Sequence, residues 1–110
     1  MRKNKSTVAP IYFNVSQARE QLLGKGIVYT CRHKKRHINN QVTIARRGTF
    51  KKYVELARVN VTYEGSVRNP QKLKPYLKES GFITIKEWVS QIKDGLPAHL
   101  YKVRVVSTIQ

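Results

Sequence analysis

The sequence predicts an α+β fold, a small bent β-barrel of five or six strands with about three short helices. Three observations predict this fold class. Apolar and polar residues alternate over several short stretches, as in strands that bury one face. The longest of these stretches changes phase part-way, which indicates a bend that curls a sheet. Glycines and prolines separate the strands from short segments with helical spacing, and the predicted order is β-α-β-β-β-α-α-β.

The first half of the chain predicts three strands and one helix. Alternation over residues 11–15 predicts the first strand. Ser16 is expected to cap a helix over residues 17–23, which ends at one of the two following glycines. Residues 27–32 form the second predicted strand, and residues 42–44 mark the third.

A turn at Arg47-Gly48 is expected to lead into a long fourth strand, from Thr49 to Tyr63. Its apolar residues fall on even positions up to Leu56 and on odd positions further along. This change of phase predicts a bulge or bend near Ala57-Arg58. The segment 65–70, rich in glycine, asparagine and proline, is expected to be a loop.

The following segment predicts a helix of about ten residues that includes Leu73 and Leu77. We expect Pro75 in its first turn, where a missing N–H costs least, and Gly81 at its end.

A further helix begins with the capping-box spacing of Thr84 and Glu87, and its apolar residues recur with helical period from Ile85. Gly95 is the expected C-cap. Residues 101–105 alternate again and predict the closing strand.

The charge of the chain is unusual for its size. Among 110 residues, 22 are Lys or Arg and six are Asp or Glu, which gives a formal charge of +16 and a sequence pI of about 10.4. Such a surplus attracts polyanions, and nucleic acid is the commonest of them. No apolar run approaches the length of a membrane span, so we expect no membrane partner.

We expect residues 1–7 to be a flexible basic tail and residues 8–110 to be a single domain. The single cysteine excludes an internal disulfide, and no apolar leader follows the charged N-terminus. These features predict an intracellular, cytoplasmic protein (nuclear if the source is eukaryotic). No cofactor is expected.

The basic residues crowd a stretch from Gln21 to Val54 that contains no acidic residue. We expect these side chains to contact phosphates, with an affinity that falls steeply as salt rises. The predicted contacts are Lys25, Arg32, Lys34, Lys35, Arg36, Arg46, Arg47, Lys51 and Lys52.

Two aromatic residues, Phe50 and Tyr53, flank Lys51 and Lys52. Aromatic rings beside cations stack unpaired bases in proteins that bind single strands. The alternative is that one or both rings face the core of the barrel. His33 and His37 lie four apart, but no third ligand is evident, so no metal site is expected.

Several segments together resemble the ASCH domain family, a branch of the PUA-like β-barrels. The resemblance covers residues 10–106 and depends on the order of the segments, since no single motif is very specific. The similar segments are 21–25 followed by 27–32, 53–59, 77–82 followed by 84–88, and 100–105.

This resemblance implies a PUA-like barrel, and the family is proposed to bind RNA. Some similar proteins hydrolyse the amide of N4-acetylcytidine with a lysine, a threonine and a glutamate, and another group cleaves RNA. By position these catalytic residues correspond to Lys25, Thr30 and Glu79. The sequence differs from the family in the longer spacing between Lys25 and Thr30 and in Asn40-Gln41, where a Gly-Asp turn is typical.

The leading functional prediction is therefore RNA binding through a basic groove, with single-stranded or irregular RNA favoured over duplex. The first alternative is a small hydrolase of a modified nucleoside or of RNA that uses Lys25, Thr30 and Glu79. The second alternative is DNA binding by the same basic surface, for which a pocket that accepts a flipped base is a known device.

Overall fold

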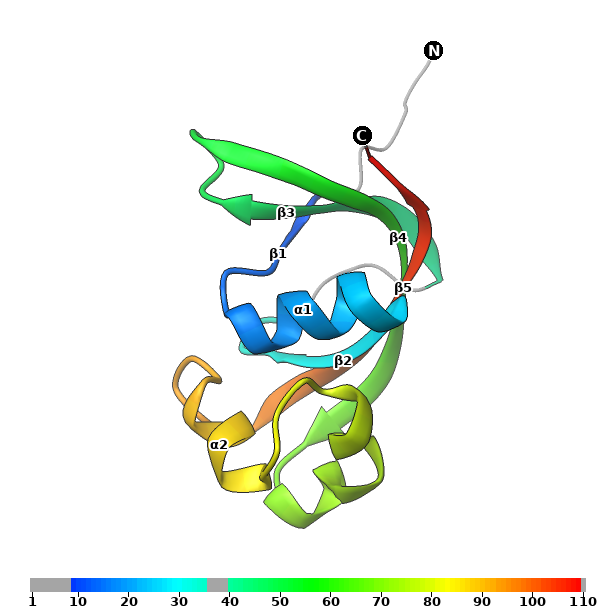
Figure 1. The fold of residues 1–110 in the computed structure, drawn as a ribbon. Coiled ribbons are helices and arrows are strands. Elements are labelled where there is room, and N and C mark those ends of the chain that lie inside the picture. Colours follow the sequence, from blue (N-terminus) through cyan, green and yellow to red (C-terminus); the bar gives the residue numbers. More distant parts are fainter. Residues whose placement is uncertain (1–8, 36–39, 110) are drawn as a thin grey trace.

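The elements follow one another in the predicted order (Figure 1). The computed structural model describes residues 9–35 and 40–109, and within them it has five strands and three helices. The elements are β1 (Ile11–Tyr12), α1 (Ser16–Lys25), β2 (Ile27–Arg32), β3 (Gln41–Gly48), β4 (Tyr53–Val67), the 3₁₀ helix η2 (Pro70–Glu79), α2 (Ile85–Ser90) and β5 (Ala98–Thr108).

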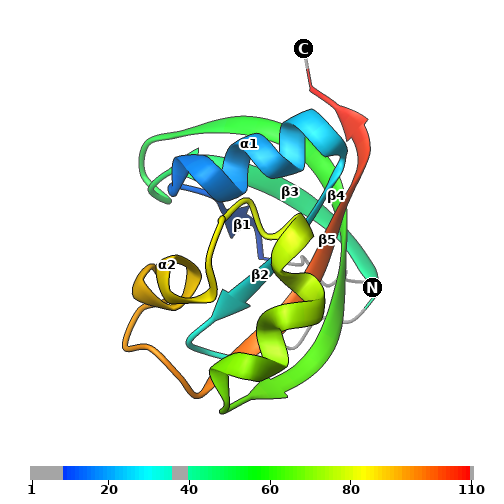
Figure 2. The same cartoon turned by 60° about the horizontal axis from the view of Figure 1, so that its bottom comes forward.

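The five strands form one sheet in the order β1-β3-β4-β5-β2, curled into a half-barrel. Its central pairs are antiparallel, and β1 pairs with β3 in parallel. The long strands β4 and β5 run side by side through the whole molecule (Figures 1 and 2). The α+β class and the curled sheet are thus confirmed, with five strands rather than six.

The predicted bend lies in β4 within one residue of its expected place. Ala45 and Arg46 of β3 pair with Ala57 and Glu55, so Leu56 is the extra residue of a bulge. Because an extra residue increases the local twist, the strand curls at this point.

The loop expected over residues 65–70 begins later than predicted. A second bulge places Glu64 opposite no residue of β5, and Gly65 adopts a φ of 131°. Glycine adopts this conformation without steric cost, so β4 bends here, stays paired with β5 and continues to Val67.

Two hydrophobic cores share the sheet. The first lies inside the curl, where Ala18 and Leu22 of α1 pack on Val59, Val61 and Val103. The second lies under η2 and α2, where Leu73 and Trp88 pack on Cys31, Val67 and Leu100. β2 contributes to both cores, because Val28 faces the first and Cys31 the second. Figure 2 shows η2 and α2 together at one end of the molecule.

Four predicted ends of the first strand, α1 and β3 are corrected. β1 stops at Tyr12, and Ser16 is the first residue of α1 rather than its cap. α1 continues to Lys25, where Gly26 takes a φ of 81° and its N–H donates to the Leu22 carbonyl. The turn after β3 follows Gly48 instead of including Arg47.

The helix that contains Leu73 is a 3₁₀ helix, and Pro75 lies inside it rather than in its first turn. A proline in that position lacks the N–H that an α-helix needs and its ring crowds the preceding turn. The chain therefore forms tighter turns, starting at Pro70 behind the Asn69 cap.

The capping residue of α2 is confirmed, since the Thr84 hydroxyl accepts from the Glu87 N–H. The Glu87 carboxylate reaches back to the N–H of Ile83. α2 ends at Ser90, before the expected C-cap. Gly95 instead closes the following turn with a hydrogen bond to the Ile92 carbonyl.

Candidate nucleic-acid interface

Strands β3 and β4 meet in a protruding turn, which we call the hairpin tip (residues 47–53) (Figure 1). Thr49 and Lys52 close the turn with reciprocal backbone hydrogen bonds of 2.8 and 3.2 Å. Asn14 fastens its base, because its amide donates to the Gly48 carbonyl (2.9 Å) and accepts from the Gly48 N–H (2.7 Å). The hairpin tip is therefore tied to the segment after β1.

The hairpin tip presents both cations and aromatic rings to solvent. Arg47, Lys51 and Lys52 are exposed. Phe50 is 76% exposed and Tyr53 is 41% exposed. The sequence left open whether these rings face the core, and the structure places both outside it.

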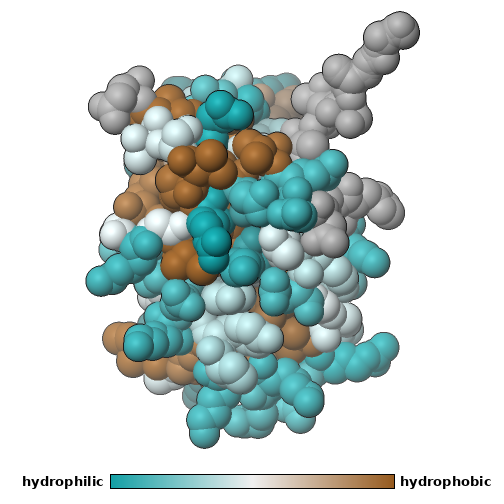
Figure 3. Space-filling view, turned by 90° about the vertical axis from the view of Figure 1, so that its right-hand side faces the viewer, coloured by the Kyte–Doolittle hydropathy of each residue, from teal (hydrophilic) through white to brown (hydrophobic). Residues whose placement is uncertain are grey.

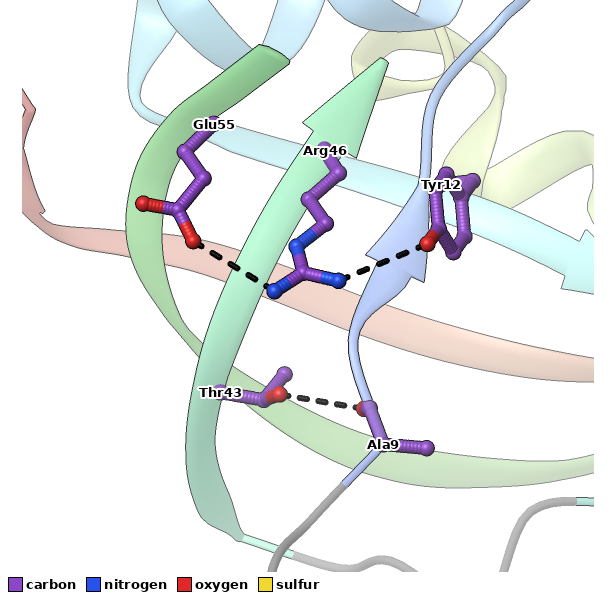
Figure 4. Close-up of polar contacts among 5 residues, drawn as sticks. All are labelled: Ala9, Tyr12, Thr43, Arg46 and Glu55. Atoms are coloured by element: carbon purple, nitrogen blue, oxygen red, sulfur yellow. Dashed lines mark hydrogen bonds and ion pairs between the residues drawn. The ribbon is translucent and has the colours of Figure 1, made fainter. Parts of the chain in front are cut away.

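Arg46 lies just before the hairpin tip and is held by fixed partners (Figure 4). Its guanidinium donates to Glu55 (3.4 Å) and to the Tyr12 hydroxyl (3.5 Å), and it lies 3.7 Å from the centre of the Tyr53 ring. The hydrogen bond to Tyr12 is the main cause that raises the pKa of Arg46, with smaller contributions from Tyr53 and Glu55. The guanidinium thus stays charged and oriented.

Arg32 lies at the seam, which we define as the line where the edge strands β1 and β2 face each other at Tyr12, Phe13 and Arg32. The Arg32 guanidinium donates to the Tyr12 carbonyl (2.8 Å) and to the Thr30 hydroxyl (3.3 Å). It also lies 4.9 Å from the centre of the Phe13 ring. Arg32 therefore bridges the open side of the half-barrel.

A cavity of about 260 Å³ lies beside the seam. Its wall combines aromatic rings from both cores with polar side chains, among them Phe13, Thr30, Arg32 and Trp88. Cys31 also lines it, and burial raises the pKa of this thiol to about 12. The thiol is therefore protonated at neutral pH and is a poor nucleophile.

The remaining predicted contacts in the stretch after β2 differ in their surroundings. Lys34 and Lys35 are exposed, and the Lys35 ammonium lies 5.0 Å from the centre of the Tyr63 ring. Arg36 and His37 lie outside the described residues. The Nε2 atom of His33 lies 3.6 Å from the Oδ2 atom of Asp94.

The structure does not bring the three candidate catalytic residues to one cavity. Lys25 is exposed at the end of α1 and lines a separate cavity with Glu20 and Gly81. Thr30 is buried and lines the seam cavity. Glu79 ends η2, where its charge adds to the effect of burial in raising the pKa of Tyr29.

Acidic residues are distributed unevenly over the fold. In the described chain up to Tyr63, Glu20 and Glu55 are the only acids beside ten Lys and Arg. The other four, Glu64, Glu79, Glu87 and Asp94, lie in the second half with η2 and α2. The surplus of positive charge is therefore larger in the first part of the chain, which contains the hairpin tip.

The sheet also carries exposed apolar side chains. Val42, Val54 and Val106 are exposed on the adjoining strands β3, β4 and β5. Figure 3 shows apolar residues gathered in the upper half of the face it draws, with hydrophilic residues around them. Among the described residues, none of the helices has the length and apolar character needed to cross a lipid bilayer.

Sequence reasoning missed Tyr12 and Asn14, which orient the hairpin tip. Each lies 34 residues from its partner, Arg46 or Gly48, so no local spacing indicates the contact. The only local signal was polar residues inside a short strand pattern, which is common in proteins.

Comparison of the chain with protein-family models, with curated proteins and with solved structures finds no match in any of the three. The function of the protein is therefore inferred from the geometry of the site.

Proposed function

We propose that this protein binds nucleic acid, with single-stranded or irregular RNA preferred, through the hairpin tip and the cations around it. The observation that carries the proposal is the exposure of Phe50 and Tyr53 on either side of Lys51 and Lys52. Exposed aromatic rings beside cations offer planar faces on which unpaired bases stack.

The electrostatics support a polyanionic partner. The hairpin tip has three exposed cations and no acid, and the acid nearest to it in the sequence, Glu55, is already paired with Arg46. Each phosphate that these cations neutralise releases counterions, which favours binding at low salt.

The aromatic rings favour unpaired nucleotides over a duplex. In a duplex the bases are stacked on one another, so only edges and backbone are accessible. In a single strand the base faces are available to rings such as Phe50 and Tyr53. The choice of RNA over DNA rests on the resemblance to the ASCH family and its PUA-like barrel.

Hydrolysis of a modified nucleoside is not favoured by any contact. Such a reaction needs an activated nucleophile and a charged group at one reacting atom. Lys25 and Thr30 line separate cavities, and the Thr30 hydroxyl already accepts a hydrogen bond from Arg32.

The proposal is tested by titrating the full chain with labelled single-stranded RNA, duplex RNA, single-stranded DNA and duplex DNA at several salt concentrations. We expect the tightest binding to single-stranded RNA and weaker binding to all four as salt rises. The interface is located with the double variant Lys51→Ala/Lys52→Ala.

A matched control is Lys72→Ala/Lys74→Ala, which removes the same charge from exposed positions of η2. We expect the hairpin variant to lose more affinity than this control. Negligible binding of all four nucleic acids at low salt would falsify the proposed function, and equal losses in the two variants would move the interface away from the hairpin tip.

A further inference from the structure

The Arg46 guanidinium covers one face of the Tyr53 ring. The Arg46 guanidinium lies 3.7 Å from the ring centre, which is the separation of two stacked planar groups. Tyr53 is still 41% exposed, so Arg46 leaves part of its surface accessible.

Hydrogen bonds to two neighbouring strands hold the Arg46 guanidinium in place. Glu55 accepts from one terminal nitrogen and the Tyr12 hydroxyl accepts from the other, so the plane of the guanidinium is set by two strands (Figure 4). The Arg46 side chain is only 19% exposed. Its charge is therefore less accessible to a phosphate than the charges of Arg47, Lys51 and Lys52.

We propose that the open face of Tyr53 stacks one unpaired base of the bound strand, and that Arg46 is the positioning residue of this platform rather than a phosphate contact. This inference rests on the proposed function and names the group that the site selects: an unpaired base. A ring that is already oriented loses less conformational freedom on binding than a mobile one, which increases the affinity gained from stacking.

The platform predicts selectivity that charge alone does not supply. Cations on the hairpin tip attract the phosphates of a single strand and of a duplex alike. The Tyr53 ring gains a contact only where a base is free to leave its neighbours. Loss of the ring therefore reduces the preference for single strands and leaves duplex affinity unchanged.

The test combines removal of the ring with removal of the bases. The probes are a short single-stranded oligouridylate, the same oligomer with abasic sites in place of uridines, and a duplex RNA. We expect Tyr53→Leu to weaken oligouridylate binding by about 5- to 150-fold, the range for one base stacked on an aromatic ring. For the abasic oligomer and the duplex, the wild type and Tyr53→Leu are expected to bind equally.

Two variants provide matched controls for the ring. Tyr53→Phe keeps the ring and is expected to bind oligouridylate like the wild type. Val54→Ala removes the neighbouring exposed apolar side chain, which is 62% exposed, and is expected to change nothing. Circular dichroism spectra confirm that each variant keeps its sheet.

The positioning role of Arg46 is tested with two variants that separate orientation from charge. Arg46→Lys keeps the positive charge but loses the planar group, and we expect weaker oligouridylate binding with unchanged duplex binding. Glu55→Ala removes a negative charge near the hairpin tip together with one acceptor of the Arg46 guanidinium. Electrostatics alone predicts tighter binding to every probe, whereas loss of positioning predicts a lower ratio of oligouridylate to duplex affinity.

The outcomes distinguish the two proposals. If the wild type binds the abasic oligomer and the duplex but Tyr53→Leu binds oligouridylate as well as the wild type does, nucleic-acid binding stands and the base platform is wrong. Equal losses on all three probes would likewise overturn the platform. If the wild type binds none of the probes at low salt, both proposals fail together.

Discussion

The seam and the hairpin tip each pair an aromatic ring with a cation, in opposite surroundings. At the seam, Arg32 lies 4.9 Å from the centre of Phe13, and Phe13 is 1% exposed. At the hairpin tip, Lys51 lies 6.0 Å from the centre of Phe50, which faces solvent. Arg32 also donates hydrogen bonds to the Tyr12 carbonyl and the Thr30 hydroxyl.

This difference separates cations that hold the fold together from cations that are available to a partner. Arg32 joins two strands that are at opposite ends of the sheet order, so its contacts are part of the folded structure. Lys51 lies on a turn whose backbone closes without it. We therefore expect changes at the seam to affect stability and changes at the hairpin tip to affect binding.

The largest expected effect contrasts the two phenylalanines. Phe13→Ala leaves a cavity in the first core and is expected to lower the free energy of unfolding by about 3–5 kcal/mol. Phe50→Ala is expected to change it by less than about 0.5 kcal/mol, because the ring is exposed. Urea unfolding followed by circular dichroism measures both free energies. Similar losses in the two variants would contradict the difference between a buried Phe13 and an exposed Phe50.

The next effect concerns the cation of the seam. Arg32→Ala removes the donor to the Tyr12 carbonyl and is expected to lower the free energy of unfolding by about 1–3 kcal/mol. Lys34→Ala, two residues away and exposed, serves as the control and is expected to be neutral. If the two variants unfold at the same urea concentration, Arg32 does not close the half-barrel.

A pH effect is also expected at the seam, from Cys31. Burial raises the pKa of its thiol to about 12, above the value in the unfolded chain. The stability that this shift provides is complete below the unfolded pKa and is lost as pH rises toward the folded one.

At pH 10 the loss is expected to be on the order of 1 kcal/mol relative to neutral pH. Urea unfolding at neutral pH and at pH 10 measures it for the wild type and for Cys31→Ala. The alanine variant is expected to lose less stability over this interval, since it has no thiol to titrate. Equal losses in the two proteins would contradict a buried thiol.

The smallest effect sharpens the assignment of the hairpin tip. Arg47→Ala is expected to reduce the slope of log affinity against log salt by about 0.7 for single-stranded RNA, as one phosphate contact is lost. Lys86→Ala, an exposed cation of α2, is expected to leave the slope unchanged. A slope that falls equally in both variants would indicate a diffuse attraction without a defined interface.

Local patterns predicted the elements well where neighbouring residues decide the conformation. The bounds of β2 and the Thr84 cap of α2 agree with the structure, because alternation and capping act over a few residues. The bend of β4 was also predicted within one residue. The end of β4 was not, since a bulge at Glu64 keeps the strand paired with β5 where glycine suggested a loop.

The candidate site was predictable only as a set of residue types. Lys51, Lys52 and their flanking aromatics were recognised as a group, and all of them are exposed. Arg32 and Arg46 were expected among the same contacts, yet both have fixed partners within the fold. Charge in a sequence does not show which cations are already paired.

Residue types and their spacing along the chain were sufficient to predict the order of the elements, the large positive charge and its separation from most of the acids. These properties depend on residue type and on spacing over one or two turns of chain. The fold was needed to show that Phe50 faces solvent while Phe13 is buried, and that Tyr12 contacts Arg46. Burial depends on neighbours that are far apart in the chain, and the curl of the sheet brings those neighbours together.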